Sequence, residues 1–150
     1  MHTDPEIRRA TIADLEILIP LFDAYRQFYR KSSDLDGARR FLSERFEKNE
    51  AIVFLATLGG AAAGFTLLYP SFSSVSMAPI FVLNDLFVTP EARRAGVATL
   101  LLQTAADFGR GAGAVRLVLS TELTNTKAQA LYERAGWERD TVFCSYQLSL

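Results

Sequence analysis

Histidine and cysteine are almost missing from this sequence of 150 residues, which contains only His2 and Cys144. With its one histidine beside the N-terminus, the chain has no suitable base for a Ser-His-Asp or Cys-His catalytic arrangement. A histidine-rich metal site is excluded on the same ground. A lone cysteine allows neither an internal disulfide nor CxxC chemistry, so we expect Cys144 to pack as a small hydrophobic side chain.

The chain also lacks a strong net charge and an apolar leader. Its formal net charge is −1 and its pI is about 5.8, so no global basic field favours nucleic acid as a partner. The opening residues MHTDPEIRR contain no apolar h-region, so we expect no secretory signal. Together with the scarcity of cysteine, this favours a cytoplasmic location.

Residues 51–84 contain no Asp, Glu, Lys or Arg, which raises the question of a membrane span. Gly59-Gly60 and Gly64 divide the first part of this region into pieces of strand length, and four serines and Pro79 follow. Strands that are buried on both faces produce the same uncharged runs. We therefore expect buried strands and no membrane association.

Apolar periodicity and turn residues predict an order of strand, two helices, three strands, helix, strand, helix and strand. The expected strands cover 6–10, 51–57, 62–69, 81–88, 114–120 and 141–148, and Pro70 ends the third. The expected helices run over 11–31 from a capping box at Thr11, over 33–49, from 93–98 to 111 or 113, and from 125 to 136. This order predicts one domain over residues 1–150, an α/β or α+β sandwich with helices on a mixed sheet.

The segment Arg93-Arg94-Ala95-Gly96-Val97-Ala98 follows a predicted strand and opens a predicted helix. Its small residues allow a ligand close to the backbone, and the unsatisfied N–H groups of the helix start attract anions such as phosphate. The alternative is a glycine turn with two solvated arginines. Other phosphate loops are excluded, because no lysine completes a GxxxxGK motif and no GxGxxG follows a strand directly.

The array from Leu83 to Trp137 resembles the core of the GNAT superfamily of acyl-CoA-dependent N-acetyltransferases. Residues Arg93 to Ala98 match the Q/R-x-x-G-x-G/A loop of that family, and the helix beginning at Asn125 matches its N-x-x-A-x-x-L-Y pattern. The resemblance implies a mixed, mostly antiparallel central sheet flanked by helices. It also implies acetyl-CoA as the acyl donor and no metal.

The resemblance assigns the cofactor-binding residues. It implies that the loop Arg93, Arg94, Ala95, Gly96, Val97 and Ala98 binds the pyrophosphate of coenzyme A. It also implies that main-chain groups of Leu86, Phe87 and Val88 hold the pantetheine arm. A backbone N–H at a bulge of this strand, from Phe87 or Val88, is expected to polarise the thioester carbonyl. Asn125 is expected to contact the cofactor, with a helix N-cap as the other reading.

Two catalytic roles follow in the same way. Tyr132 is expected to protonate the departing thiolate, although its spacing alone would fit a packed aromatic side chain. Asp85 is expected to be the base or the anchor of the substrate ammonium, against a purely structural carboxylate. Glu122 is a second candidate base. Strand alternation places Asn84 and Asp85 on opposite faces, which would leave one of them out of reach of the acceptor.

The acceptor pocket of this family lies along its first two helices, so we assign Tyr25, Tyr29 and Asn84 to substrate binding. Aromatic side chains and carboxylates suit an ammonium group. The expected activity is acetyl transfer to a primary amine of a polyamine, an amino acid or a similar small molecule, or of a lysine-containing peptide. The alternative is a non-catalytic acyl-CoA sensor. We also expect a homodimer, because residues 143–150 are apolar enough to pair as strands between copies.

Overall fold

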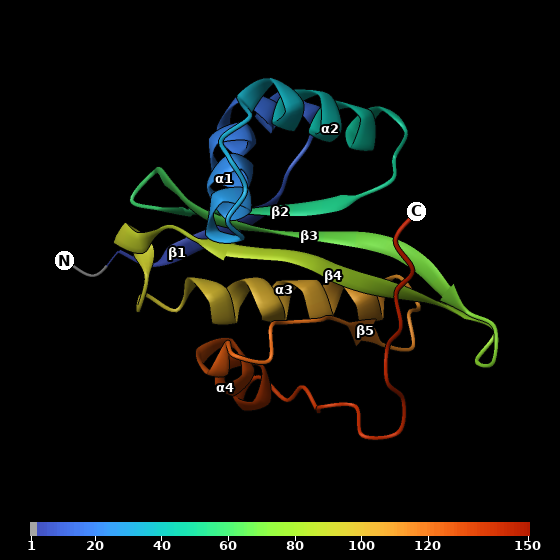
Figure 1. The fold of residues 1–150 in the computed structure, drawn as a ribbon. Helices are drawn as coiled ribbons and strands as arrows, with labels where there is room; N and C mark the ends of the chain where they lie inside the picture. Colours follow the sequence, from blue (N-terminus) through green and yellow to red (C-terminus); the bar gives the residue numbers. More distant parts are fainter. Residues whose placement is uncertain (1–2) are drawn as a thin grey trace. The chain divides into compact units, whose positions relative to one another are not determined.

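Five strands form one sheet in the order β1–β2–β3–β4–β5, and only the β4–β5 pair is parallel. The computed structural model describes residues 3–150 (Figure 1). The strands are β1 Pro5–Arg9, β2 Ile52–Leu58, β3 Ala61–Ser73, β4 Ala78–Val88 and β5 Leu117–Val118. The helices are α1 Leu15–Phe28, α2 Leu35–Glu47, α3 Val97–Gly111 and α4 Thr126–Arg134, and the short 3-10 turns Ile12–Asp14 and Pro90–Ala92 precede α1 and α3. The predicted mixed, mostly antiparallel sheet with flanking helices is confirmed.

The chain divides into two compact units, residues up to Ser120 and residues Thr121–Leu150. The first unit contains the whole sheet with α1, α2 and α3. The second contains α4 and the C-terminal segment, and each unit is described by itself.

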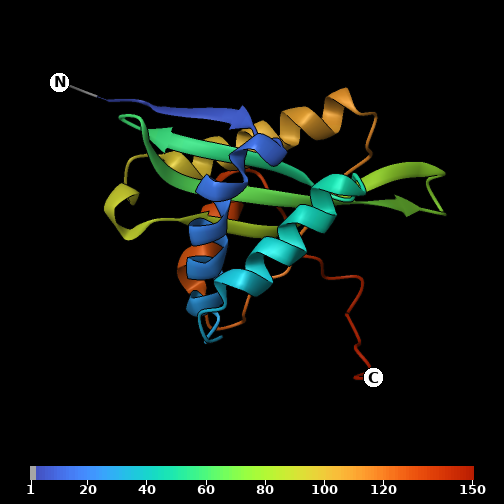
Figure 2. The same ribbon diagram turned by 90° about the horizontal axis from the view of Figure 1, so that it is seen from above.

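In the first unit, α1 and α2 cover one face of the sheet and α3 covers the other (Figure 1). Figure 2 shows α1 and α2 lying across the strands. On their side, Val53, Leu55, Phe65 and Leu67 are buried in one cluster with residues of both helices. On the other side, the ring of Phe108 in α3 contacts Phe54 and Phe81. Helices on both faces explain why β2 and residues 63–68 of β3 carry no charge, whereas the uncharged residues 74–77 between β3 and β4 are exposed.

Capping residues in the sequence mark where the first two helical segments begin. Thr11 forms the predicted capping box with Asp14, whose carboxylate also makes an ion pair with Arg8 at 2.7 Å. Asp34 caps α2 by accepting a hydrogen bond from the backbone N–H of Gly37. No helix among residues 3–150 is long and apolar enough to cross a membrane.

The end predicted for β3 is wrong. This strand continues through Pro70 to Ser73. Beyond Leu68 it pairs only with β4, so it is an edge there. Proline lacks an N–H donor but is tolerated at a strand edge, where one side of the backbone needs no partner.

The C-terminal prediction is also wrong, because residues 139–150 form no strand or helix in the second unit. Phe143 and Tyr146 are 79% and 94% exposed, and Cys144 is exposed rather than packed. The side chains have the strand pattern, but a strand also requires a backbone partner, which an apolar pattern cannot supply. Strand 114–120 is likewise reduced to Leu117–Val118, the part that pairs with β4.

Candidate active site

A β-bulge on β4 determines where Asp85 points. In the pairing of β3 with β4, Leu67 lies opposite Asp85 and Leu68 lies opposite Leu83, so Asn84 is the extra residue. Leu67 belongs to the cluster below α1 and α2, so its partner Asp85 faces these helices as well. Without the bulge, Leu83 and Asp85 would share a face. The bulge therefore turns the carboxylate towards α1 and α2.

Asp85 is a buried carboxylate that is only partly satisfied. Its side chain accepts a hydrogen bond of 2.8 Å from Nδ2 of Asn84 through Oδ1, while buried Oδ2 has no partner among the described residues. Its backbone carbonyl accepts a hydrogen bond from the Thr66 hydroxyl, which is fully buried. Burial raises the pKa of Asp85 to about 6, although the hydrogen bond from Asn84 acts in the opposite direction.

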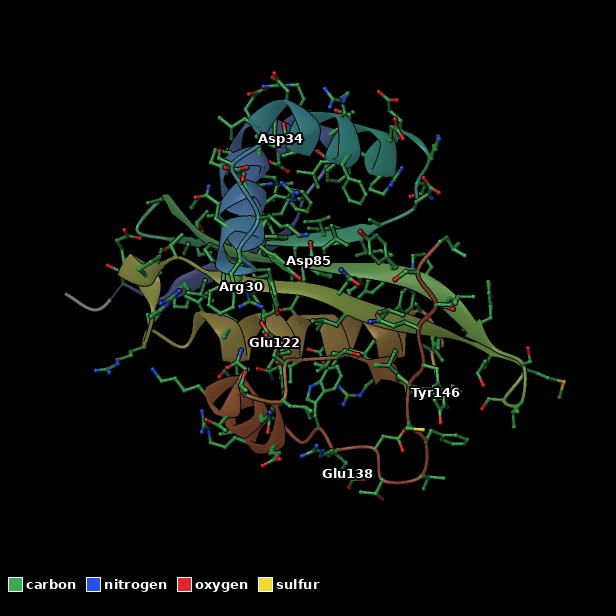
Figure 3. All side chains as sticks on the ribbon, viewed as in Figure 1. Arg30, Asp34, Asp85, Glu122, Glu138 and Tyr146 are labelled. Carbon is green, nitrogen blue, oxygen red and sulfur yellow. The ribbon has the colours of Figure 1, made fainter. Side chains whose placement is uncertain are left out.

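A pocket of about 480 Å³ lies between α1, α2 and the sheet, and Asp85 is one of its lining residues. Tyr25, Tyr29 and Asn84 also line it, so all four residues predicted for the acceptor side come together. The Tyr25 hydroxyl donates to the backbone carbonyl of Asn84 at 3.1 Å, and the rings of Tyr25 and Tyr29 are 5.1 Å apart. In Figure 3, Asp85 lies on the sheet below the helices and Asp34 lies above it.

The expectation that Asn84 and Asp85 would be separated is therefore wrong, because both line this pocket. Strand alternation holds only in a regular ladder, and the bulge at Asn84 interrupts it.

Sequence reasoning missed Tyr69, Phe22 and Phe41 as pocket residues. Burial raises the pKa of Tyr69 to about 12, and the neighbouring Asp85 adds to this effect while Arg45 opposes it. Phe65, Leu67 and Tyr69 alternate along β3 and belong to or pack against the same cluster. That spacing was a signal in the sequence that could have placed Tyr69 beside the pocket.

The predicted phosphate loop forms an exposed turn between the Pro90–Ala92 turn and α3. Arg94 and Gly96 both have positive φ, +67° and +79°, and Gly96 is the N-cap of α3. No side chain caps this helix start, and its first turn contains no acidic residue. Left-handed residues at a helix start turn successive N–H groups towards one point, which suits an anion. This arrangement fits the pyrophosphate of coenzyme A.

The end of β4 contains Leu86, Phe87 and Val88, the residues expected to hold the pantetheine arm. Their pairing with β3 is regular, from Leu67 opposite Asp85 to Gly64 opposite Val88. The bulge expected at Phe87 or Val88 lies instead at Asn84. A Cβ atom on Gly64 would lie 2.4 Å from the backbone oxygen of Phe87, so the two strands approach more closely here than another residue would allow.

In the second unit, the Asn125 side chain accepts a hydrogen bond of 3.1 Å from the backbone N–H of Ala128, so Asn125 caps α4. The ring of Tyr132 lies 6.2 Å from that of Trp137. The backbone carbonyl of Glu122 accepts a hydrogen bond from the side chain of Gln129. Among residues 3–150 no group of three or more His, Cys, Asp or Glu side chains is placed to hold a metal ion.

The Acetyltransferase (GNAT) family matches residues 18–137 of this chain. An uncharacterized N-acetyltransferase, YhfO of Bacillus subtilis, is 49% identical over 144 residues, which cover 96% of this chain and 97% of the relative. The crystal structure of a probable acetyltransferase is similar with a TM-score of 0.92 at 41% identity, over 97% of both chains. An aminoglycoside N-acetyltransferase in complex with CoA has a TM-score of 0.82 at 22% identity, over 100% of this chain and 98% of that one.

This chain therefore belongs to the GNAT family of acetyltransferases, as its loop and its C-terminal helix pattern predicted. It is an acyl-CoA-dependent N-acetyltransferase.

Proposed function

We propose that this enzyme acetylates a primary amine of a small molecule, such as a polyamine or an amino acid, or of a lysine-containing peptide. The amine binds in the pocket between α1, α2 and the sheet. The observation that carries this proposal is the buried Asp85, whose Oδ2 has no partner among the described residues of a pocket lined by aromatic side chains. An ammonium group supplies both the charge and the hydrogen bond that this oxygen lacks.

Asp85 is the proposed base. An amine is protonated at neutral pH and must lose a proton before its nitrogen can form the new amide bond. With a pKa of about 6, Asp85 is ionised at neutral pH and is a stronger base than an exposed aspartate. Asn84 holds Oδ1, so Oδ2 is the oxygen that takes the proton.

The loop residues Arg93 to Ala98, the strand end Leu86 to Val88 and Asn125 are the proposed contacts for acetyl-CoA. The bound donor supplies the acetyl group and leaves as the free thiol. The backbone N–H of Phe87 or Val88 is still the proposed donor to the developing oxyanion, although the bulge on this strand lies at Asn84 and not at these residues. Tyr132 is the proposed acid. No covalent enzyme intermediate is required, and Cys144 lies outside these motifs.

We further propose that residues 1–150 act as one acetyltransferase domain, in the cytoplasm and as a homodimer. The exposed apolar side chains of the C-terminal segment, Val142, Phe143 and Leu148, support the dimer, because such groups gain from burial against a partner. Light scattering of the purified protein tests this part, and a monomer at micromolar concentration would contradict it.

A thiol-release assay with acetyl-CoA and a panel of amines tests the activity. We expect Asp85→Asn to lower kcat/KM by about 100-fold or more, the range for a general base, while affinity for coenzyme A stays unchanged. Asp107→Asn is the matched control, because Asp107 is an exposed carboxylate on α3 whose partner is Arg110. Wild-type rates in Asp85→Asn would refute Asp85 as the base, and no thiol release with any amine would refute the activity.

Tyr132→Phe tests the proposed acid separately. We expect this variant to lose most of its rate and to keep its affinity for coenzyme A, since only the phenolic proton is removed. A variant with unchanged kcat would show that Tyr132 only packs against Trp137.

A further inference from the structure

The charges that line the acceptor pocket differ between its buried and its exposed parts. The buried charge is Asp85, which is 3% exposed and lies among the rings of Phe22, Tyr25 and Tyr69. An ammonium group on an apolar stem fits this end, because the rings accept the stem and the carboxylate accepts the charge.

The lining also contains two cations, the half-buried Arg26 and the exposed Lys31. Lys31 forms no ion pair with any residue in 3–150, and Arg26 donates only a long hydrogen bond of 3.4 Å to the carbonyl of Ser32. Arg26 also lies near enough to Asp23 to contribute to the low pKa of that carboxylate. Lys31 is therefore the cation that is most available to a ligand.

The acidic groups near these cations accept hydrogen bonds from neutral donors. Asp34 lines the pocket, but its Oδ1 accepts the N–H of Gly37 as the cap of α2. Asp23 is buried and accepts hydrogen bonds from the Ser33 hydroxyl, the Gln27 amide and the backbone N–H of Asp34. Asp34 remains a negative charge, because its partner is a neutral N–H, so this part of the lining contains two cations, Lys31 and Arg26, against one carboxylate. A second ammonium group therefore meets net repulsion there.

Resting on the proposed acetyl transfer in this pocket, we propose that the natural acceptor is an amine that carries an anionic group at its other end, as an amino acid does. Its ammonium group binds at Asp85, and its carboxylate binds at Lys31 and Arg26. A polyamine, which has a second ammonium group in place of the carboxylate, is disfavoured at the same site.

Acceptors that differ only in the group at the far end test this proposal. ε-Aminocaproate, cadaverine and n-hexylamine carry the same chain with an anionic, a cationic and a neutral end, and shorter homologues of each cover other chain lengths. We expect kcat/KM from thiol release to be highest for the amino acid and lowest for the diamine at the best length. A higher kcat/KM for the diamine would overturn the inference and leave the proposed acetyl transfer intact.

Charge reversal at Lys31 makes the test specific to this pocket. Lys31→Glu removes an attraction for the amino acid and adds one for the diamine. We therefore expect the ratio of their kcat/KM values to fall by about tenfold, the size of effect that partly exposed charge pairs produce. Lys48→Glu makes the same change near the end of α2, outside the pocket, and should leave the ratio unchanged.

The affinity of both variants for coenzyme A, measured by calorimetry, confirms that they are folded. An unchanged ratio in Lys31→Glu, or an equal fall in Lys48→Glu, would overturn the role of Lys31. If no amine is acetylated by the wild-type enzyme, the proposed function itself fails, and this inference fails with it.

Discussion

Asp85→Asn should make the protein more stable at neutral pH while it lowers activity. The pKa of Asp85 is about 6 in the folded protein against a usual value of 3.8, so the folded state binds its proton more tightly than the unfolded state does. Stability therefore falls as the pH rises between these two values and stays low above about pH 6. A difference of about two pKa units corresponds to about 3 kcal/mol at pH 7.5, because each unit contributes about 1.36 kcal/mol. The asparagine side chain has nearly the same shape as aspartate and carries no charge, so the variant avoids the cost of burying a charged carboxylate.

Urea unfolding at two pH values measures the effect. At pH 7.5 we expect Asp85→Asn to raise the free energy of unfolding by up to about 3 kcal/mol, and at pH 4 by only about half a kcal/mol. Asp14→Asn is a control with the opposite sign, because the Arg8 hydrogen bond and ion pair hold the pKa of Asp14 below its usual value. The free energy of unfolding of that variant should fall by about 1 kcal/mol at pH 7.5, because the substitution disrupts the capping box. The reasoning is refuted if Asp85→Asn is destabilised at pH 7.5, or if its gain is the same at both pH values.

Two glycine substitutions test the backbone of the cofactor side. Gly64→Ala should lower stability by about 1–3 kcal/mol in thermal unfolding, because the added Cβ would meet the backbone oxygen of Phe87. The same variant should have a higher KM for acetyl-CoA. Wild-type values for both quantities would show that β4 can move away without consequence. Gly96→Ala meets no atom within 4 Å, so only its φ of +79° should cost stability, about 1–2 kcal/mol, and calorimetry should show weaker coenzyme A binding. Asparagine tolerates a positive φ better than alanine does, so Gly96→Asn should lose less stability than Gly96→Ala. Equal losses of stability in the two variants would contradict this explanation.

Much of the fold could be predicted because its signals are local. Thr11 with Asp14 and Asn125 with Ala128 form caps within one turn of chain, so residue type and spacing suffice to place them. The failures concern pairing between distant segments. The segment around Tyr146 has the alternation of a strand and forms none, while β3 continues past Pro70 because β4 lies beside it.

The candidate site shows the same division. The turn and helix start at Arg93 to Ala98 could be predicted from the sequence, because they form from consecutive residues. Binding of phosphate by this loop stays a prediction. The alternation along β3 shows which face Tyr69 is on, but its position beside Asp85 depends on the pairing of β3 with β4. Asn84 and Asp85 were expected on opposite faces, and the bulge that brings both to the pocket is a property of two paired strands.

The sequence by itself determined the family, the glycine turn before α3 and the position of Asp85 as the first charged residue after the uncharged residues 51–84. These features depend on residue type, spacing and short-range hydrogen bonds, which involve only residues that are close in the sequence. Only the tertiary structure decided what that charge does. The bulge on β4 turns Asp85 towards α1 and α2, and burial there raises its pKa to about 6 and leaves Oδ2 without a partner among the described residues. Strand register and burial arise from contacts between residues far apart in the chain, so they exist only once those residues are brought together.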